Sequence, residues 1–347
     1  MKRYFVTGAQ GFVGRYVVAR LLSSDGSVEV LGIGRSPRSD DAFTHSVRWA
    51  ARRVVAPLPD AMRSAFDTAR YRYVPLDLCR CSELGRVLRD FQPEVVIHLA
   101  SALRDDAPSS LLRVNIQGTL DLLAALAQSG VSLQKLVLGS TGGVYGAPAE
   151  LPIRESASCN PVDLYSASKL AAEQFSRILA RQHRMPAVWA RLFNLAGPGQ
   201  DERHICGRFA AQAAAIAEGA APPVIEVGAL EATRDFIDVR DAASALLLVA
   251  EQGACGSAYN LASGIESPAR RVLELTLQLA GLQGRVRIDG REFRASDVPR
   301  HFACIERLRS LGFDCRLGLS ESIRDLLNYY RHSVRAAAQA DAAERAP

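Results

Sequence analysis

The sequence predicts an α/β fold built around a doubly wound, parallel sheet, with a smaller region toward the C-terminal end. Through the first half of the chain, short apolar runs alternate with amphipathic segments of helix length. The apolar runs are continuous, which is typical of strands buried on both faces of a sheet. Repeated strand–helix units make the strands parallel, because each helix returns the chain to the same end of the sheet.

Six strands and four helices are expected from these runs. The strands span residues 3–7, 28–33, 71–76, 95–99, 135–140 and 187–192, and the helices span residues 12–23, 82–91, 109–129 and 165–183. Residues 36–70 lie between the second and third strands and contain Trp49, Pro57 and Pro59. We expect this segment to be a long, irregular insertion.

The strand–helix rhythm ends near residue 195, which predicts two domains in the 347 residues. The first spans residues 1–193 and carries the sheet. The second spans residues 194–332, and part of it is expected to return to the sheet. The Ala-rich, polar tail over residues 333–347 is expected to fray.

Composition excludes several classes of protein. Hydrophobic residues make up 48% and charged residues 23%, as in soluble globular proteins. The formal charge of +5 raises the question of nucleic acid, but the arginines are spread along the chain and no nucleic-acid-binding or zinc motif is present. No apolar run approaches a membrane span or a signal peptide. Seven scattered cysteines without a C-x-x-C pair indicate reduced thiols. We therefore expect a cytoplasmic protein with no metal site and no nucleic-acid or membrane partner.

Three glycines lie between the first expected strand and the first expected helix, at a G-x-x-G-x-x-G spacing. The first two allow a tight turn and a close approach of the backbone to a pyrophosphate, and the third allows the helix to pack against the strand. The N-terminus of the helix adds free N–H groups that bind anions. The motif predicts a dinucleotide site in a Rossmann-like fold, with candidate contacts from Gly8, Gln10, Gly11, Phe12, Val13 and Gly14.

The end of the second strand indicates which dinucleotide binds. NAD sites place an acid there for the ribose 2′-hydroxyl. This chain has Arg35 and Arg38 instead, and arginine suits a 2′-phosphate. We predict NADP(H), favoured over NAD(H), with Arg35 on the 2′-phosphate and Arg15 assisting.

Tyr165 and Lys169 stand four residues apart in an expected helix, so both side chains lie on one face. A phenol titrates near ~10 and is a poor acid at neutral pH unless a cation favours its ionised form. Only three of the 42 basic residues are lysines, so a chance lysine at this offset is rare. The pair predicts general acid catalysis by Tyr165. A hydroxyl at the end of the fifth strand, from Ser140 or Thr141, is the candidate for polarising a substrate carbonyl.

At these residues the chain resembles the extended short-chain dehydrogenase/reductase family, the NAD-dependent epimerase/dehydratase group. The glycine motif, Asp77 after the third strand, His98 at the end of the fourth, and the Tyr165/Lys169 pair match in order. The resemblance implies that Thr141 is the catalytic hydroxyl. It also implies that Lys169 orients the cofactor ribose and that the cofactor contacts Asp77, Leu78, Leu99, Ala100, Ser101 and Leu192.

The C-terminal half resembles the branch of this family that reduces GDP-4-keto-6-deoxy sugars. The likeness lies in residues 191–200, 227–241 and 293–299. It implies diphosphate contacts from Asn194, Arg234 and Arg294, a nucleoside contact from Asp297, and further substrate contacts from Ser140 and Arg208. Ala229 departs from the Asn of these relatives, and the sugar and nucleobase stay open.

The function implied by the resemblance is NADPH-dependent reduction of the C4 ketone of a nucleotide-linked 4-keto-6-deoxy sugar, in deoxysugar and cell-surface glycan biosynthesis. Tyr165 would donate the proton, Lys169 would lower its pKa, and Thr141 would bind the carbonyl oxygen. The helices over 109–129 and 165–183 resemble those that form a four-helix bundle between two subunits, so a homodimer is expected. Two alternatives are a nucleotide-sugar 4-epimerase with tightly bound NAD and a non-catalytic NADP-binding sensor or scaffold.

Gly142 and Gly143 follow the catalytic threonine, where related dehydratases and epimerases carry acidic residues or a cysteine. Glycine has no titratable group, so we expect neither dehydration nor epimerisation at C3 or C5. His204 is a candidate for the substrate side of the site.

Overall fold

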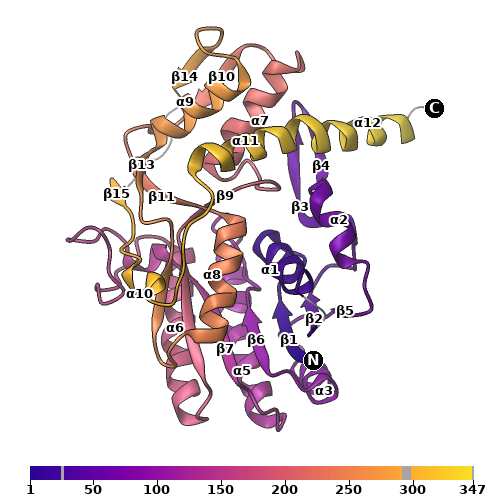
Figure 1. Cartoon of the computed structure of the whole chain (residues 1–347), viewed down its shortest axis with the longest axis vertical. Helices are drawn as coiled ribbons and strands as arrows, with labels where there is room; N and C mark the ends of the chain where they lie inside the picture. Colours follow the sequence, from indigo (N-terminus) through magenta and orange to yellow (C-terminus); the bar gives the residue numbers. More distant parts are fainter. Residues whose placement is uncertain (25–26, 291–297, 346–347) are drawn as a thin grey trace.

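A seven-stranded parallel sheet forms the centre of the molecule (Figure 1). The computed structural model describes residues 1–24, 27–290 and 298–345. In spatial order the strands are β5 (Tyr71–Pro75), β2 (Val28–Gly34), β1 (Lys2–Thr7), β6 (Val95–His98), β7 (Lys135–Thr141), β8 (Ala187–Leu192) and β12 (Ala258–Leu261). Every neighbouring pair is parallel. The expected fold class is confirmed, and each expected strand is present to within one residue at either end.

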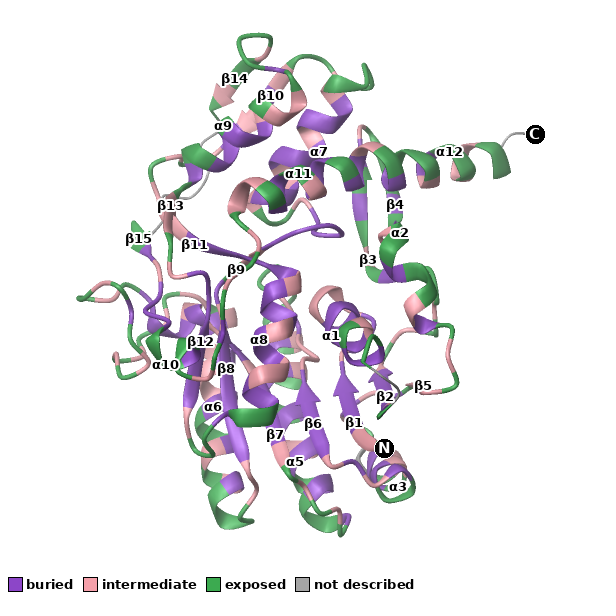
Figure 2. Cartoon of the chain, viewed as in Figure 1, coloured by how far each residue is buried: buried purple, intermediate pink, exposed green. Residues whose placement is uncertain are grey.

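Helices cover both faces of this sheet (Figure 2). On one face lie α1 (Phe12–Leu22) and α8 (Val239–Gln252), and on the other lie α3 (Cys81–Phe91), α5 (Gly118–Gln128) and α6 (Leu164–Gln182). Successive strand residues point to opposite faces, so Tyr4 and Val6 join the first core while Phe5 joins the second. The continuous apolar strands of the sequence are explained by this double burial.

The expected helix over residues 109–129 has an interruption. It begins as α4 (Pro108–Ser110), continues as a wider π-helical segment, η2 (Leu111–Gln117), and becomes α-helical in α5. Such π-helical turns often occur at functional sites. Here the segment carries the buried Asn115, whose side chain donates a hydrogen bond to Ser168 of α6.

The direction of the chain reverses between β1 and β6. From β1 the chain moves through β2 to β5, and it then returns to place β6 on the other side of β1. Ligands in sheets of this kind bind outside the carboxyl ends of the strands at such a switch point. The topology therefore places a binding site above β1 and β6.

The chain after residue 193 lies largely above those carboxyl ends (Figure 1). Its elements are β9 (Asn194–Ala196), α7 (Ile205–Ala217), β10 (Val224–Val227), β11 (Thr233–Asp238), β13 (Glu266–Pro268), α9 (Ala269–Ala280), β14 (Arg287–Gly290), β15 (Arg300–His301), α10 (Glu306–Arg309) and α11 (Leu319–Tyr329). Strand β11 pairs with β9, β13 and β15, and β10 pairs with β14. From this half of the chain, α8 and β12 lie in the layers of the central sheet.

Residues 36–70 are more ordered than the irregular insertion that we expected. They form an antiparallel hairpin of β3 (Ala42–Trp49) and β4 (Arg52–Pro57), followed by α2 (Asp60–Arg63) and the short helix η1 (Ser64–Phe66). Phe43, Val47 and Trp49 alternate along β3 and are buried. This period of two was the signal for a strand.

The expectation of a frayed tail is wrong. After α11 the chain continues through η4 (Tyr330–Val334) into α12 (Arg335–Glu344). Ala338 is buried, and its carbonyl accepts a hydrogen bond of 3.2 Å from Arg52 of β4. The hairpin thus supplies the tertiary contact that holds the tail in a helix.

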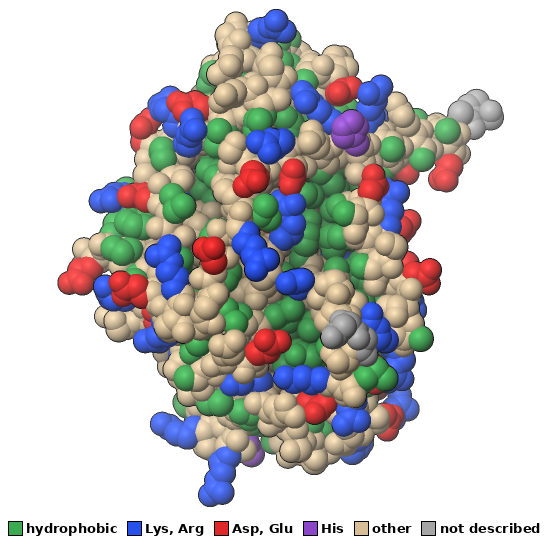
Figure 3. Space-filling view, viewed as in Figure 1, with side chains coloured by type: hydrophobic (Ala, Val, Ile, Leu, Met, Phe, Trp, Pro, Cys, Tyr) green, Lys and Arg blue, Asp and Glu red, His purple; other side chains and the backbone are tan. Residues whose placement is uncertain are grey.

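The surface carries its charges in a mixed pattern. On the face drawn in Figure 3, basic side chains alternate with acidic ones and do not gather into one patch. Within the described part of the chain, no helix combines the length and the apolar character needed to cross a bilayer.

Candidate active site

One large cleft, with a volume of about 1160 Å³, opens at the carboxyl ends of β1, β6, β7 and β8. Apart from Arg15 and Arg38, the described residues that were predicted for the site line it. These are Gly8, Gln10, Gly11, Phe12, Val13, Gly14, Arg35, Asp77, Leu78, Leu99, Ala100, Ser101, Ser140, Thr141, Tyr165, Lys169, Leu192, Asn194, Arg208 and Arg234. Arg294 and Asp297 lie outside the described residues.

The glycine motif turns the chain from β1 into α1 with no room for side chains. Gly8 has a φ of +68°, and a Cβ there would lie 2.8 Å from the Ala100 nitrogen of the neighbouring strand end. A Cβ on Gly14 would collide with the Gly8 carbonyl oxygen and lie 2.9 Å from Ala9 Cα. Gly11 is the N-cap of α1, so the first N–H groups of that helix have no partners within the helix. This geometry suits a pyrophosphate.

Arg15 has a structural role, contrary to our expectation that it assists at the phosphate. Its side chain is fully buried and lies over the Phe66 ring at 4.6 Å. The guanidinium donates to the carbonyl oxygens of Ser39 and Ala42 and to the Gln10 side chain. Gln10 also accepts from Ser39 N and donates to Pro37 O. Both side chains therefore hold the loop after β2, which sequence spacing alone did not reveal.

Arg35 stands at the end of β2, exposed and lining the cleft. Its neighbour Arg38 instead pairs with Asp40 at 2.7 Å. Across the cleft from Arg35, Asp77 pairs with Arg113 at 2.8 Å and accepts a hydrogen bond from Cys79 N. Of these basic side chains, Arg35 is the one placed at the point where the 2′ position of a bound ribose is expected.

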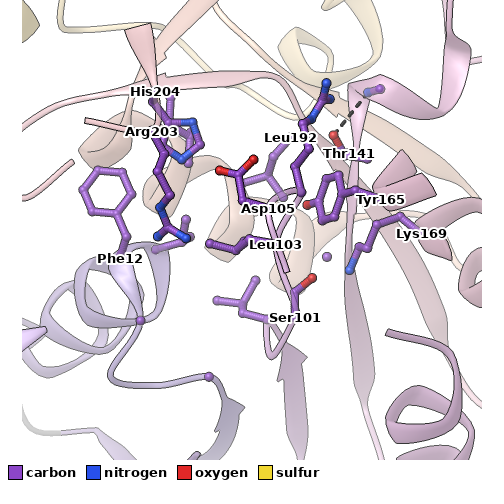
Figure 4. Close-up of a pocket in the computed structure, with 18 of the residues that line it drawn as sticks. Phe12, Ser101, Leu103, Asp105, Thr141, Tyr165, Lys169, Leu192, Arg203 and His204 are labelled. Atoms are coloured by element: carbon purple, nitrogen blue, oxygen red, sulfur yellow. Dashed lines mark hydrogen bonds between the residues drawn. The ribbon is translucent and has the colours of Figure 1, made fainter. Parts of the chain in front are cut away.

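Thr141, Tyr165 and Lys169 point into the same part of the cleft, as Figure 4 shows. Thr141 ends β7, and its hydroxyl accepts a hydrogen bond of 3.1 Å from Gly143 N. Helix α6 begins just before Tyr165, where Asp163 caps it by accepting from Ser166 N at 2.9 Å. The cap fixes the first turn, and therefore the position of Tyr165 next to the strand end.

The electrostatics of the pair differ from the sequence-based expectation. Burial raises the pKa of Tyr165, and a hydrogen bond with Ser101 and the charge of Arg104 oppose that rise only in part. Burial also lowers the pKa of Lys169 to about 8, with Glu173 acting in the opposite direction. In this structure Lys169 therefore does not lower the Tyr165 pKa. Tyr165 is therefore protonated at neutral pH and can donate a proton, but the raised pKa makes it a weaker acid than a free phenol.

The choice between Ser140 and Thr141 is resolved by their hydrogen bonds. The Ser140 hydroxyl is buried and donates to the Glu173 carboxylate at 3.1 Å, behind the cleft. The Thr141 hydroxyl accepts from a backbone N–H, so its own hydrogen is free to reach a carbonyl oxygen in the cleft. The geometry favours Thr141 as the catalytic hydroxyl, as the family resemblance implied.

Asn115 is a site residue that sequence reasoning missed. It is fully buried in the π-helical segment, and its amide oxygen accepts from Ala102 N at 2.7 Å and from the Ser101 hydroxyl. Its amide nitrogen donates to the Ser168 hydroxyl on α6 at 2.9 Å. Asn115 thus joins the loop after β6 to the catalytic helix. The sequence signal for a buried, hydrogen-bonded side chain was a single Asn within an apolar helical stretch.

The end of the cleft away from the glycine motif is rich in cationic and imidazole groups. Arg234 is half-buried on β11, and burial followed by the charge of Arg104 lowers its pKa. Figure 4 shows Arg203 and His204 facing Asp105 across the cleft, so His204 lines the cleft, and its contact with substrate stays a prediction. Sequence reasoning missed the other cleft residues of this group, which are Arg104, Asp105, Arg203 and His301. None of these four residues belongs to a recognisable sequence motif.

The Gly142–Gly143 segment leaves no space for side chains. A Cβ on Gly142 would lie 2.8 Å from the Phe193 ring, and one on Gly143 would collide with the Ser166 hydroxyl. His301 lies beside the segment, with its Nε2 at 3.1 Å from the Gly142 carbonyl oxygen. Burial, together with Arg234, lowers the pKa of His301 to about 4. The imidazole is therefore neutral at pH 7 and donates its Nε2 hydrogen to the backbone.

Comparison with known proteins places this geometry in a family. Residues 4–262 match the NAD dependent epimerase/dehydratase family. The chain is 32% identical over 343 residues to the GDP-6-deoxy-D-mannose reductase of Pseudomonas aeruginosa, covering 96% of this chain and 99% of the relative. It is 29% identical over 340 residues to a UDP-glucose 4-epimerase of Mycolicibacterium smegmatis, covering 95% and 99%.

Solved structures agree with this placement. The structure of RMD from Pseudomonas aeruginosa complexed with NADPH superposes with a TM-score of 0.77 at 30% identity, covering 96% of this chain and 100% of that one. A putative epimerase from Burkholderia cenocepacia superposes with a TM-score of 0.77 at 29% identity, covering 95% and 98%. The glycine motif, the Tyr165/Lys169 pair and the match over three quarters of the chain lead to one conclusion: the protein belongs to the NAD dependent epimerase/dehydratase family.

Proposed function

We propose that the protein is an NADPH-dependent reductase that acts on the C4 ketone of a nucleotide-linked 4-keto-6-deoxy sugar, with a GDP-linked substrate. The observation that carries this proposal is the meeting of Thr141, Tyr165 and Lys169 in a cleft that has a dinucleotide motif at one end and arginines at the other. The likeness to a GDP-6-deoxy-D-mannose reductase over nearly the whole chain supports the choice of substrate. The reaction would use the product of a sugar-nucleotide dehydration and supply a glycosyl transfer to cell-surface glycans.

The residues present fit the dinucleotide. Gly8, at a positive φ, makes the tight turn, and Gly14 lets α1 pack closely on the strand end, so the first N–H groups of α1, which have no partners within the helix, can bind a pyrophosphate. Arg35 would hold the 2′-phosphate, and Lys169 would hold the ribose hydroxyls. When bound, NADPH supplies the hydride.

The protein's own groups act on the substrate carbonyl. Tyr165 is protonated at neutral pH and donates its phenolic proton to the oxygen that becomes the C4 hydroxyl. Thr141 donates a hydrogen bond to the same oxygen and stabilises the negative charge that develops on it. Arg234 and Arg208 bind the diphosphate, which fixes the sugar ring in front of Tyr165.

A panel of nucleotide-linked 4-keto-6-deoxy sugars, followed by NADPH absorbance, tests this proposal. We expect the highest kcat/KM with the GDP-linked sugar. In D₂O we expect no deuterium at C3 or C5, because Gly142 and Gly143 carry no acid or base. Bound NAD in the purified protein, with interconversion of C4 epimers and no need for added NADPH, would instead establish a 4-epimerase. NADPH binding without turnover of any sugar would establish a sensor or scaffold.

Cofactor choice gives a separate prediction. Arg35→Ala should weaken NADPH binding by about 1.5–3 kcal/mol and leave NADH binding nearly unchanged, because only NADPH carries the 2′-phosphate. Isothermal titration with both cofactors measures this difference. Arg38→Ala is the matched control, since Arg38 already pairs with Asp40 and should change neither affinity. Equal losses for NADPH and NADH in Arg35→Ala would remove Arg35 from the 2′-phosphate site.

We also propose a homodimer through α6 and the neighbouring η2, with α5 completing the bundle. The segments α6 and η2 pack side by side, and they expose Leu112, Phe175 and Ile178 to between 46% and 61%. Apolar side chains of this size on paired helices are typical of a protein–protein contact. Two subunits would bury them in a four-helix bundle.

The dimer proposal predicts the effect of charge on this surface. Phe175→Glu combined with Ile178→Glu should yield a monomer, because each buried side chain of this size contributes about 1.5–3 kcal/mol. Size-exclusion chromatography with light scattering measures the mass. Ile288→Glu, at an exposed position on β14, is the control and should leave the mass unchanged. A wild-type protein that is monomeric at micromolar concentration would contradict the proposal.

A further inference from the structure

Glu173 is a buried carboxylate behind the catalytic pair. It lies on α6 one turn beyond Lys169, on the same face of the helix, and only 2% of it is exposed. It does not line the large cleft, so it touches neither end of the proposed substrate site. A buried charge of this kind is costly unless it is paired and hydrogen-bonded.

Both carboxylate oxygens of Glu173 are engaged. Arg191 of β8 donates to one oxygen at 2.6 Å and to the other at 3.2 Å. Arg177, also on α6, donates to the first oxygen at 2.9 Å. Ser140, at the end of β7 next to the catalytic Thr141, donates to the second oxygen at 3.1 Å. Glu173 therefore ties the catalytic helix to two strand ends. Burial would raise its pKa, but the two arginines outweigh that effect and lower it, so Glu173 is ionised at neutral pH.

A small second cavity joins Glu173 to Lys169. Its volume of about 10 Å³ is close to that of one water-sized probe, and most of its accessible wall is apolar. The polar residues that line it are Lys169, Glu173, Ser140, His98, Thr119 and Ser176. Lys169 and Glu173 thus face one cavity, which also shares Ser140 with the cleft.

His98 does not provide a charge in this cavity. The Thr7 hydroxyl accepts from Leu99 N and Ala100 N, so its hydrogen goes to His98 Nδ1. Thr119 donates to Asn115 O and so accepts from His98 Nε2. These bonds fix a neutral imidazole, and burial followed by the charge of Lys169 lowers the His98 pKa to about 3.

The described groups around Lys169 are neutral or cationic, apart from Glu173. On α6 it has Tyr165, a neutral phenol, and Glu173; β6 presents the neutral His98, and β7 presents the hydroxyl of Ser140. Beyond Glu173 lie the cations Arg177 and Arg191 and, against Arg191, the neutral phenol of Tyr145. Among the described side chains in this group, Glu173 is the negative one.

We propose that Glu173 is a positioning residue for the reaction: it is the buried counter-charge that keeps Lys169 an ammonium and holds it against the end of β7. This inference rests on the proposed function for its catalytic meaning, but the charge relationship itself is independent of the substrate. Without the carboxylate, Lys169 would share a buried region with two arginines and lose its proton. A neutral Lys169 binds the ribose hydroxyls of the cofactor less strongly than an ammonium does.

The three lysines of the chain make this directly measurable. Protein made with [ε-¹³C]lysine gives three NMR signals, from Lys2, Lys135 and Lys169, and Lys169→Arg identifies the third by its loss. We expect Lys169 to titrate near pH 8 in the wild type, and at least one pH unit lower in Glu173→Gln. Lys2 and Lys135 should not move. Glu173→Asp keeps the charge and should restore most of the wild-type midpoint.

The pH dependence of kcat/KM should shift in the same direction as the Lys169 midpoint. With saturating NADPH, Glu173→Gln should move the alkaline fall of kcat/KM to lower pH by the same interval and reduce kcat/KM at pH 7 by about twofold or more, because a midpoint at pH 7 leaves half of Lys169 protonated there. Glu155→Gln is the matched control: its side chain is also buried and near Arg307, but it does not line the Lys169 cavity. That variant should leave the midpoint and the alkaline limb in place.

Two results would overturn the proposal. One is an unchanged Lys169 midpoint in Glu173→Gln; the other is a loss of activity that is uniform across pH, which marks a purely structural role. If Glu173→Gln does not fold, Arg177→Gln provides the test with the opposite sign. Arg177 is partly exposed, and removing its cation should raise the Lys169 midpoint. A fall would contradict the proposal. A shifted midpoint with no turnover of any sugar would instead reject the proposed function and leave the charge relationship standing.

Discussion

Replacing Tyr165 by phenylalanine is expected to lower kcat/KM by about 10²–10⁴-fold while NADPH affinity stays within about twofold of the wild type. In the proposed mechanism the phenol donates the proton, and the phenylalanine ring keeps the shape of the cleft wall. Stopped-flow reduction of the 4-keto sugar measures the chemical step, and fluorescence titration measures NADPH binding. The effect should be the largest among single hydroxyl deletions in the cleft, because the other hydroxyls only position or polarise groups.

The control for this variant is Tyr73→Phe. Tyr73 also lines the cleft, at its cofactor end, but its hydroxyl donates to the Ser36 carbonyl at 2.9 Å. Removing that hydroxyl should cost about 0.5–1.5 kcal/mol of stability and leave kcat nearly unchanged. Near-wild-type reduction by Tyr165→Phe would show that a different group donates the proton.

Gly14→Ala is expected to weaken NADPH binding severely and to lower the melting temperature. The added methyl would collide with the Gly8 carbonyl oxygen and lie 2.9 Å from Ala9 Cα, and both are backbone atoms that cannot rotate away. Overpacking of this kind typically costs 1–3 kcal/mol and sometimes more, which is ~5- to 100-fold or more in Kd if the strain falls on the binding loop. Isothermal titration and differential scanning calorimetry measure the two effects.

Gly85→Ala is the matched glycine control. Gly85 is also within a helix, α3, but a Cβ there meets only the end of the flexible Arg89 side chain at 3.4 Å. Alanine should stabilise that helix by up to about 1 kcal/mol without affecting the cofactor. Unchanged NADPH affinity in Gly14→Ala would mean that the glycine motif does not hold the pyrophosphate.

Local patterns of the sequence were enough to predict six of the seven strands of the central sheet, and β12 was not among them. Each strand of a parallel sheet covered on both faces is a continuous apolar run, and the helices between them have a clear amphipathic period. The glycine motif and the Tyr165/Lys169 spacing are also local, because a tight turn and one helical turn are each set by a few consecutive residues. These features place the two halves of a predicted site at the same end of the sheet before any contact is known.

Contacts between distant segments decided the rest. The period of two in β3 was present in the sequence but was obscured by the prolines and charges around it. The tail is Ala-rich, and alanine is the strongest helix former, so its helix had a local signal. Its contact with the hairpin, in which Arg52 binds the carbonyl of Ala338, did not, because no spacing rule relates residues 286 positions apart.

The sequence by itself determined the family, the fold class and the residue types available for catalysis, since these depend on order and spacing along the chain. Only the tertiary structure decided what each side chain does. It sent Arg15 into the core, assigned the Ser140 hydroxyl to Glu173 and left that of Thr141 to face the cleft. It also brought Glu173 and Arg191 together behind Lys169. Charge and hydrogen bonding act through space over a few ångströms, so the protonation of a buried lysine depends on neighbours that the sequence separates and the fold brings together.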